Sequence, residues 1–277
     1  MATVFTPGKS VDGLFWGTVG AGPPLIVVHG PMGYDHTYLR PWLDRLGEHA
    51  RVVYFDLSGC GASPGRGEVS VESWADDVDA VRSALGVERV SVLGHCAGAW
   101  IALEYARRRP EHLSNLILCC GTPTFDFVEE IFAAATRRFT EAQLHDLQTI
   151  HTASTLDEAT FRRLLLSILP LYFHRYDDPY VEAFASRMRL DAPVYLRIRD
   201  GQFTRYDCTP WLDTIGARTL VVAGRHDVIT PLDRSAARFV RLMPNATLHV
   251  LEDSGHFPFM EEPSAFTDAV GSWLGGN

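Results

Sequence analysis

The sequence predicts an α/β domain built on a mostly parallel, doubly wound sheet, with a helical segment inserted between two of its strands. Short apolar runs alternate with helical patterns up to about residue 119 and again from residue 219 onward. This alternation is typical of parallel strands joined by right-handed crossovers. Between them, residues 124–210 carry helical patterns and no convincing buried strand. We therefore expect residues 1–123 and 211–277 to form the core, and residues 124–210 to form a cap over the C-terminal edge of the sheet.

Each predicted strand is a short apolar run that ends at a turn signal. Residues 25–28 are apolar throughout, as expected of a strand buried on both faces. The predicted strands are residues 14–19, 25–28, 51–55, 90–93, 116–119, 219–223 and 247–251. The predicted core helices are residues 38–49, 73–85, 99–109 and 263–274, and the predicted cap helices are residues 125–139, 141–151, 158–169 and 180–190.

The composition is that of a soluble globular protein. The 277 residues are 46% hydrophobic and 21% charged, and the net charge is −9. This acidic balance offers no positive footprint, so we expect neither nucleic acid nor an anionic membrane as a partner. The first residues lack the basic and apolar regions of a signal peptide. Five cysteines without metal-type spacing favour a cytoplasmic protein with no metal and no cofactor.

The clearest chemical signal lies where a predicted strand meets a predicted helix. The apolar run 90–93 ends at the sequence GHCAG, residues 94–98, and a helical pattern follows at once. A nucleophile at the tip of a sharp strand-to-helix turn needs glycine on both sides, and this is the context of the G-x-S-x-G motif. Cys96 holds the place of the serine, so we predict that Cys96 is the nucleophile.

The partners of the nucleophile are predicted from later strand ends. Asp227 and His256 each follow a predicted strand, which gives the order nucleophile, acid, base. His256 would take the proton of the Cys96 thiol and later give it to the leaving group. Asp227 would hold the tautomer of His256 and stabilise its cation. Asp126 also follows a predicted strand and is the rival acid.

Five motifs stand in order along the chain: HGPMG at 29–33, DLSGCGAS at 56–63, GHCAG at 94–98, GRHDVITP at 224–231 and Gly-His at 255–256. They resemble those of the α/β-hydrolase superfamily from about Leu14 to Leu274, and the core is most similar to the proline-iminopeptidase branch. That branch usually shows HGGPG and D-Q-R-G-x-G-x-S, whereas here Gln-Arg is replaced by Leu57 and Ser58, and the nucleophilic serine by Cys96. The resemblance implies a hydrolase that cleaves an amide, peptide or ester bond of a small acyl, aminoacyl or ester substrate through an acyl-enzyme.

The resemblance also implies an oxyanion hole made by two backbone N–H groups. One belongs to Ala97 and the other to the residue after His-Gly, which here is Pro31. Proline has no N–H. Either Met32 supplies a substitute, or the site does not stabilise an oxyanion in the usual way. The candidate substrate-binding residues are His29, His95 and Trp100, with bracing of the loop as the alternative for His29.

Three other functions are compatible with these residues. A thioester reacts with amines and carbanions more readily, relative to water, than an oxygen ester does. The chain is therefore alternatively a biosynthetic acyltransferase or a Dieckmann-type cyclase, acting on a free or carrier-bound substrate through a thioester on Cys96. A second alternative is a serine hydrolase in which serine has been exchanged for cysteine. A third is a non-catalytic binding protein, which the intact Cys-His-Asp set disfavours.

The predicted cap gives two weaker indications of the substrate. Its aromatic residues either favour an apolar substrate or form the core of the cap. Its carboxylates could hold a substrate amine, as in proline iminopeptidases, with surface charge as the simpler explanation. The aromatic residues are Phe125, Phe127, Phe132, Tyr172, Phe173, Tyr176 and Phe203, and the carboxylates are Glu129, Glu130, Asp177 and Asp178.

Overall fold

The core of the protein is an eight-stranded sheet. The computed structural model describes residues 4–30, 32–65, 69–176, 184–201 and 205–276. The strand order is β1-β2-β4-β3-β5-β6-β7-β8. β2 pairs antiparallel with both β1 and β4, and the other neighbours pair parallel. The strands are β1 (Thr6–Pro7), β2 (Trp16–Val19), β3 (Pro24–Val28), β4 (Arg51–Phe55), β5 (Val90–His95), β6 (Leu113–Cys119), β7 (Thr219–Gly224) and β8 (Ala246–Leu251).

The central strands are apolar throughout because both faces of the sheet are covered. Successive side chains of a strand point to opposite faces. Along β3, Leu25 and Val27 enter one hydrophobic core, while Ile26 and Val28 enter the other. Both neighbours of β3, β4 and β5, are parallel to it. The continuous apolar runs in the sequence are thus strands that lie between two layers.

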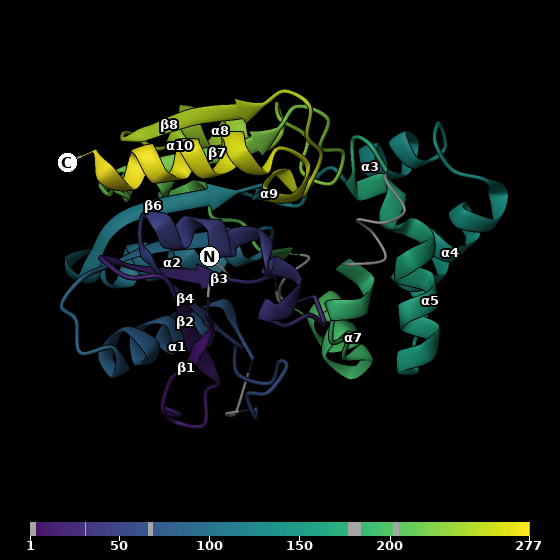
Figure 1. The fold of residues 1–277 in the computed structure, drawn as a ribbon. Coiled ribbons are helices and arrows are strands. Elements are labelled where there is room, and N and C mark those ends of the chain that lie inside the picture. The colour runs from purple at the N-terminus through teal and green to yellow at the C-terminus, as the bar shows by residue number, and fades with distance from the viewer. Residues whose placement is uncertain (1–3, 31, 66–68, 177–183, 202–204, 277) are drawn as a thin grey trace.

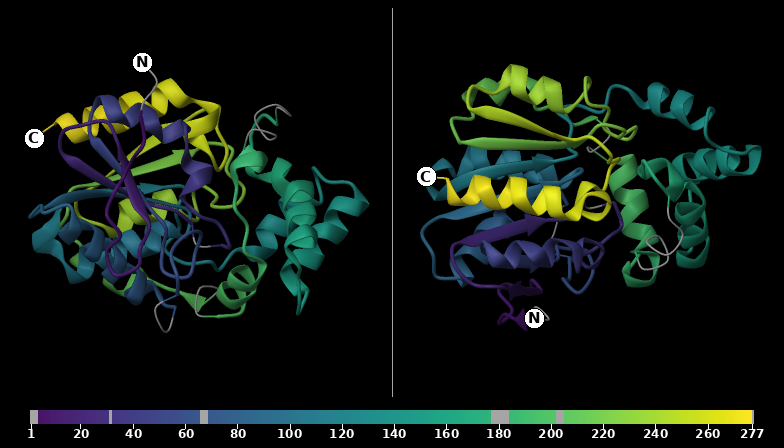
Figure 2. Two further views of the ribbon diagram at one scale, coloured as in Figure 1. Left: turned by 60° about the horizontal axis from the view of Figure 1, so that its bottom comes forward. Right: turned by 45° about the horizontal axis from the view of Figure 1, so that its top comes forward.

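Helices cover both faces of the sheet (Figures 1 and 2). On one face lie α1 (Val71–Ala84), α2 (Gly98–Arg108) and α8 (Ala236–Leu242). On the other face lie η2 (Trp42–Glu48), α9 (Pro258–Glu261) and α10 (Pro263–Gly275). No helix in the described part of the chain is long and apolar enough to cross a membrane.

The segment predicted as one helix over residues 38–49 is two 3₁₀ helices. They are η1 (His36–Leu39) and η2, and Pro41 stands just before η2. Because proline has no N–H to donate, it cannot continue a helical ladder from the preceding turn. The helix α8 and the short helix α9 were not predicted, since neither is long enough to show a clear apolar period.

A group of helices projects beyond the carboxyl ends of the parallel strands, on the side of the core away from the C-terminus (Figures 1 and 2). An antiparallel bridge between Thr124 and Asp207 brings the two ends of this segment together, and we propose residues 124–210 as the cap. Of the predicted helix 180–190, residues 184–187 are helical and residues 180–183 lie outside the described residues. The other helices of this segment, within its described residues, are α3 (Val128–Ala135), α4 (Glu141–Thr152), α5 (Glu158–Ile168), η4 (Leu169–Tyr172), α7 (Ala192–Asp200) and, at the return to the core, η6 (Thr209–Thr214).

The helix α7 was missed because its signals are local. Asp191 caps it by accepting a hydrogen bond from the Val194 amide at 2.8 Å, and a proline occupies its first turn. Such a cap followed by proline is a start signal for a helix. The Asp191 amide also donates to the carbonyl of Gly33 at 2.9 Å. The start of α7 is therefore tied to the loop after β3.

Candidate active site

Cys96 stands at a strained turn between β5 and α2. Its φ is +56°, in the left-handed region that a non-glycine residue seldom adopts. Such a conformation costs on the order of 1–3 kcal/mol and persists only where the surroundings enforce it. The Cys96 amide donates to the carbonyl of Cys119 at 3.0 Å, and its carbonyl accepts from Ala99 at 3.0 Å. Cys96 is half-buried, whereas the other four cysteines are buried.

The glycines on either side of Cys96 are required by close backbone approaches. A Cβ on Gly94 would lie 2.4 Å from the carbonyl oxygen of Gly98. A Cβ on Gly98 would lie 2.4 Å from the carbonyl oxygen of Val28. Both contacts are with backbone atoms, which cannot turn aside as a side chain could. The G-x-C-x-G spacing in the sequence thus reflects the packing of β3, β5 and α2 at this point.

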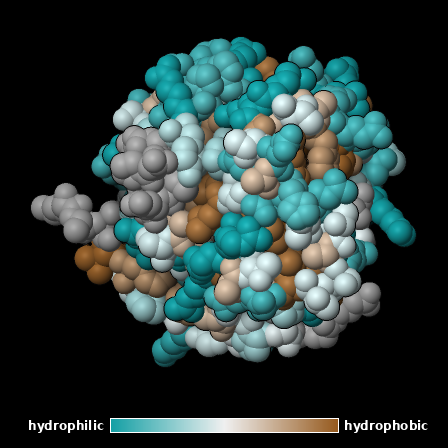
Figure 3. All heavy atoms as spheres, turned by 90° about the vertical axis from the view of Figure 1, so that its right-hand side faces the viewer, coloured by the Kyte–Doolittle hydropathy of each residue, from teal (hydrophilic) through white to brown (hydrophobic). Residues whose placement is uncertain are grey.

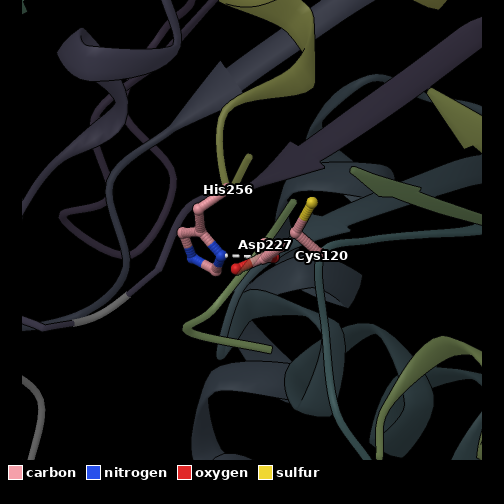
Figure 4. Close-up of side chains that lie close together, drawn as sticks. All are labelled: Cys120, Asp227 and His256. Carbon is pink, nitrogen blue, oxygen red and sulfur yellow. Dashed lines mark hydrogen bonds and ion pairs between the residues drawn. The ribbon is translucent and has the colours of Figure 1, made fainter. Parts of the chain in front are cut away.

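His256 and Asp227 form a buried pair beside the ends of β7 and β8 (Figure 4). Nδ1 of His256 lies 2.9 Å from Oδ2 of Asp227, and each side chain is 1% exposed. Oδ1 of Asp227 accepts from the amides of Ile229 and Thr230 at 2.8 and 3.0 Å. The hydroxyl of Thr230 lies 2.6 Å from Oδ2 and donates to it. These hydrogen bonds fix the carboxylate so that it faces the imidazole.

The charges of this pair shift both pKa values. Burial alone would raise the pKa of Asp227, but the His256 cation and the hydrogen bonds from Thr230 hold it below its ordinary value. Burial alone would lower the pKa of His256, but the charges of Asp227 and Cys96 outweigh this and raise it well above its ordinary value. Within the described part of the chain, the buried Nε2 of His256 makes no hydrogen bond of ordinary geometry. The imidazole therefore holds its proton more firmly than a free histidine does, within electrostatic reach of Cys96.

A chain of hydrogen bonds links the loop after β3, the turn at Cys96 and the His256 loop. The amide of Gly30 donates to the Tyr38 hydroxyl at 2.9 Å, and that hydroxyl lies 2.8 Å from Nδ1 of His95. Nε2 of His95 lies 3.0 Å from the carbonyl of His256. Since a carbonyl only accepts, Nε2 carries the proton of His95 and the Tyr38 hydroxyl donates to Nδ1. Burial and the charge of His256 lower the pKa of His95 to about 3, so His95 stays neutral.

A cavity of about 350 Å³ opens at these groups. Cys96, Ala97 and His256 form part of its wall, and residues from the proposed cap form another part. Most of the wall is aliphatic or aromatic. On the face of the molecule that includes the cap, apolar residues show only in narrow areas between hydrophilic ones (Figure 3). The apolar side chains of the cap are thus turned mainly toward the inside.

Several of the predicted site residues meet at this cavity. His95, Trp100 and Met32 line it together with Cys96 and Ala97. The indole N–H of Trp100 donates to the carbonyl of Thr122, which fixes the ring at the wall. The amide of Ala97 precedes the first turn of α2, where backbone N–H groups have no partner inside the helix. Pro31 lies outside the described residues.

The structure does not bring His29 or Asp126 to the cavity wall. His29 is fully buried, with Nδ1 3.0 Å from the Gly30 carbonyl and Nε2 accepting from the Leu57 amide at 3.2 Å. Both ring nitrogens are thus used within the protein, so His29 braces the loop and has no nitrogen left for substrate. Asp126 is half exposed and pairs with Arg238 at 3.2 Å, whereas Asp227 holds His256.

The aromatic and acidic residues of the cap separate into distinct groups. Phe125 and Tyr172 line the cavity, whereas Phe127 and Phe173 are buried in the hydrophobic core and Phe132 packs against it. Tyr176 is 42% exposed. The carboxylates Glu129 and Glu130 are exposed and do not line the cavity. Phe203, Asp177 and Asp178 lie outside the described residues.

Several polar residues of the described cavity wall were not predicted from the sequence, among them Tyr34, Tyr38, Tyr195 and Thr230. The three tyrosines and Thr230 all line the cavity. Thr230 follows Asp227 by three residues, a spacing at which an aspartate side chain often accepts hydrogen bonds from the chain after it. The sequence therefore contained a signal for the contact between Thr230 and Asp227. The tyrosines gave no such signal, because their positions depend on how the loop after β3 and the cap pack together.

Two clusters of potential metal ligands occur among the described residues. In the first, Cys120, Asp227 and His256 offer atoms within 4.8 Å of one another, and Asp227 stands between the other two (Figure 4). Burial raises the pKa of Cys120 well above its ordinary value, so its thiol stays protonated, and metals bind the thiolate. In the second, Asp35, His36 and Asp56, the His36 Nδ1 lies 2.6 Å from Asp56. The contacts His256–Asp227 and His36–Asp56 are hydrogen bonds within the protein. We therefore assign neither cluster to a metal.

Comparison with known proteins identifies the class of protein to which this fold and site belong. The profile of the alpha/beta hydrolase fold family matches residues 23–263, and the chain therefore belongs to that family. A solved alpha/beta fold family hydrolase from Bacillus anthracis str. Sterne superposes with a TM-score of 0.79 at 22% identity, over 98% of this chain and 99% of that one. The eight-stranded, mostly parallel sheet and its flanking helices agree with this family.

Two relatives have names that state an activity. The chain is 26% identical over 273 residues to a proline iminopeptidase of Heyndrickxia coagulans, which covers 92% of this chain and 91% of that protein. It is also 27% identical over 282 residues to the putative carbamate hydrolase RutD of Caulobacter sp. (strain K31). That match covers 96% of this chain and 97% of RutD. The first relative supports the resemblance to proline iminopeptidases that the motifs indicated, and both relatives are hydrolases by name.

Proposed function

We propose that this protein is a hydrolase of small molecules that forms an acyl-enzyme on Cys96, with His256 as the proton carrier and Asp227 as its partner. The observation that carries the proposal is that strained, half-buried Cys96 and the buried His256–Asp227 pair converge on one cavity. Perturbed titratable groups at a cavity are typical of active sites. The bond cleaved is an ester, amide or peptide bond.

The proposed reaction uses each group in a defined step. The positive charge on His256 stabilises the Cys96 thiolate, whose sulfur adds to the substrate carbonyl carbon. The carbonyl π electrons move to the oxygen, and in this proposal the Ala97 amide donates to the oxyanion. When the carbonyl re-forms, the leaving group departs with the proton of His256. Water then gives a proton to His256, attacks the thioester and releases the acid.

The lining of the cavity favours an uncharged, mainly apolar acyl group. Asp200 is the acidic residue on the described wall of the cavity, and Arg199 lies 2.7 Å from its carboxylate. This pairing leaves Asp200 poorly suited to hold a free substrate amine. Glu129 and Glu130, which could have done so, are exposed elsewhere on the cap. We therefore expect aryl or alkyl esters of simple acids to be better substrates than α-aminoacyl compounds.

Turnover of two p-nitroanilides that differ only in the acyl group tests this expectation. The wild-type protein should hydrolyse butyryl p-nitroanilide with a higher kcat/KM than prolyl p-nitroanilide, after each value is divided by that of the uncatalysed reaction. The Cys96→Ala variant should lose both activities and serves as the control. A preference for the prolyl compound would contradict the apolar acyl specificity. Activity that survives in Cys96→Ala would contradict the proposed nucleophile.

A second candidate function is acyl transfer or cyclisation, which two residues favour. The nucleophile is a cysteine, and Pro31 cannot supply the backbone donor expected at its position. Attack of water on a thioester depends on oxyanion stabilisation. An amine or carbanion held close to the thioester gains instead from proximity. In this case the acyl group leaves Cys96 for an acceptor bound under the cap, and no water is consumed.

A further inference from the structure

We propose that the phenol hydroxyls of Tyr34 and Tyr172 form the second side of the oxyanion site and take the role of the backbone N–H that Pro31 lacks. This inference rests on the proposed function, because it concerns the acylation of Cys96. Tyr34 follows Pro31 by three residues in the loop after β3, and Tyr172 ends η4 in the cap. The site would then combine one amide, that of Ala97, with hydroxyl donors from two separate parts of the chain.

Both tyrosines line the cavity at which Cys96 stands. They are half-buried residues of the cavity wall that Cys96 also forms. The ring of Tyr172 lies 5.5 Å from that of His256 and nearly perpendicular to it, at 72°. The backbone carbonyl of Tyr172 accepts from the His256 amide at 2.7 Å. Tyr172 is thus held in position relative to the catalytic imidazole.

The pKa values of the two phenols are shifted in the direction that keeps both hydroxyls protonated. Burial raises the pKa of both Tyr34 and Tyr172, and the negative charge of Cys96 raises each pKa further. Both hydroxyls therefore keep their protons. A protonated phenol can donate a hydrogen bond to an oxyanion.

Six other polar side chains on the described wall already have hydrogen-bond partners within the protein. Those side chains are Tyr38, His95, Trp100, Thr122, Tyr195 and Thr230. In contrast, no hydrogen bond joins the hydroxyl of Tyr34 or Tyr172 to another described residue. These two hydroxyls are the ones free to donate into the cavity.

Two reactions of the Cys96 sulfur, acylation by an ester and alkylation, distinguish an oxyanion donor from a residue that affects only the thiolate or access to it. Acylation of Cys96 by p-nitrophenyl acetate passes through an oxyanion, and release of p-nitrophenolate reports its rate. Alkylation by iodoacetamide displaces iodide and forms no oxyanion, so it depends on the thiolate and on access alone. We expect the Tyr34→Phe/Tyr172→Phe double variant to be acylated about 10²-fold more slowly, in line with the loss of an oxyanion donor. Its alkylation rate should be within about threefold of the wild-type rate, and the single variants should lie between.

Tyr195→Phe is the matched control. Tyr195 lines the same cavity, but its hydroxyl already donates to the carbonyl of Ile150 at 3.0 Å, and Arg199 donates to the same carbonyl at 3.1 Å. Its removal should leave acylation within about threefold of wild type. Acylation of the double variant at the wild-type rate would overturn the proposal and assign the donor to the backbone of Met32. A parallel loss of alkylation would also overturn it. Failure of the proposed function would instead show as wild-type Cys96 that is not acylated at all.

Discussion

His256 and Asp227 are 29 residues apart in the chain, yet Nδ1 of the imidazole lies 2.9 Å from Oδ2 of the carboxylate, with both side chains 1% exposed. The interaction raises the pKa of His256 and lowers that of Asp227 despite burial, which opposes both shifts. A charged pair is therefore the stable form of these two residues. Proton transfer at the proposed site depends on this pair.

Replacement of the acid should distinguish Asp227 from Asp126. Asp227→Asn should lower kcat for ester hydrolysis strongly, by up to about 10⁴-fold, because the amide no longer fixes the reactive tautomer of the histidine. Asp126→Asn should stay within about threefold of wild type, since Asp126 pairs with Arg238 and does not line the cavity. Steady-state kinetics on p-nitrophenyl butyrate measures both values. The reverse order in two folded variants would make Asp126 the acid.

The pH dependence of kcat/KM should report the raised pKa of His256. The protonated imidazole gives its proton to the leaving group, so the rate should fall as pH rises through this pKa. Because the pKa lies well above its usual value of about 6.5, the wild-type protein should keep its activity through neutral pH. In Asp227→Asn the main charge that raises the pKa is lost, and the alkaline limb should move to lower pH. An alkaline limb at the same pH in both proteins would contradict this assignment.

The same shift makes a prediction for stability. A histidine whose pKa is higher in the folded than in the unfolded state stabilises the fold below the unfolded value, and this contribution is lost as pH rises through the folded value. The difference in Tm between wild type and Asp227→Asn should therefore be largest between about pH 4 and pH 6.5, above the unfolded pKa of Asp227 and below that of His256, and should decrease at alkaline pH. Thermal unfolding across this range measures it. A Tm difference that grows with pH would show that the pair does not stabilise the protein in this way.

The turn that presents Cys96 should not tolerate a side chain at Gly98. A Cβ there would lie 2.4 Å from the Val28 carbonyl oxygen and 2.8 Å from that of His29, so strand or turn must shift. Gly98→Ala should cost roughly 1–3 kcal/mol of stability and should slow the acylation of Cys96. Gly216→Ala is the control, since no atom lies within 4 Å of the Cβ added there. Equal Tm values and equal activity in the two variants would mean that the turn is not tightly packed.

The choice between hydrolysis and transfer should depend on Pro31 and Cys96 together. If the natural reaction is acyl transfer, Pro31→Gly combined with Cys96→Ser should raise the ratio of hydrolysed to transferred product from one activated acyl substrate. Glycine restores a backbone N–H, and serine forms an oxygen ester. The ratio is measured by chromatography in the presence of an amine acceptor. Ordinary hydrolytic turnover by the native protein, roughly 1–10³ per second, would exclude transfer as its main activity.

Much of the core could be predicted because its strands lie between two layers and are apolar throughout. The runs at Leu25 and Val90 are strands β3 and β5, and the glycines around Cys96 marked the turn. Asp227 and Asp126 both follow a strand, however, and the contact with His256 that separates them exists only in the folded protein. The cavity hydroxyls could not be predicted at all, because they come from the packing of the cap against the loop after β3.

The central claim is that Cys96 carries the acyl group, and mass spectrometry of the acid-quenched protein tests it most directly. After brief mixing with p-nitrophenyl butyrate, the intact protein should gain the mass of one butyryl group, and peptide mapping should place that group on Cys96. His256→Ala should accumulate this adduct far more slowly, and Cys96→Ala should form none. An adduct on another residue, or hydrolysis by Cys96→Ala at the wild-type rate, would contradict the assignment of Cys96 as the nucleophile.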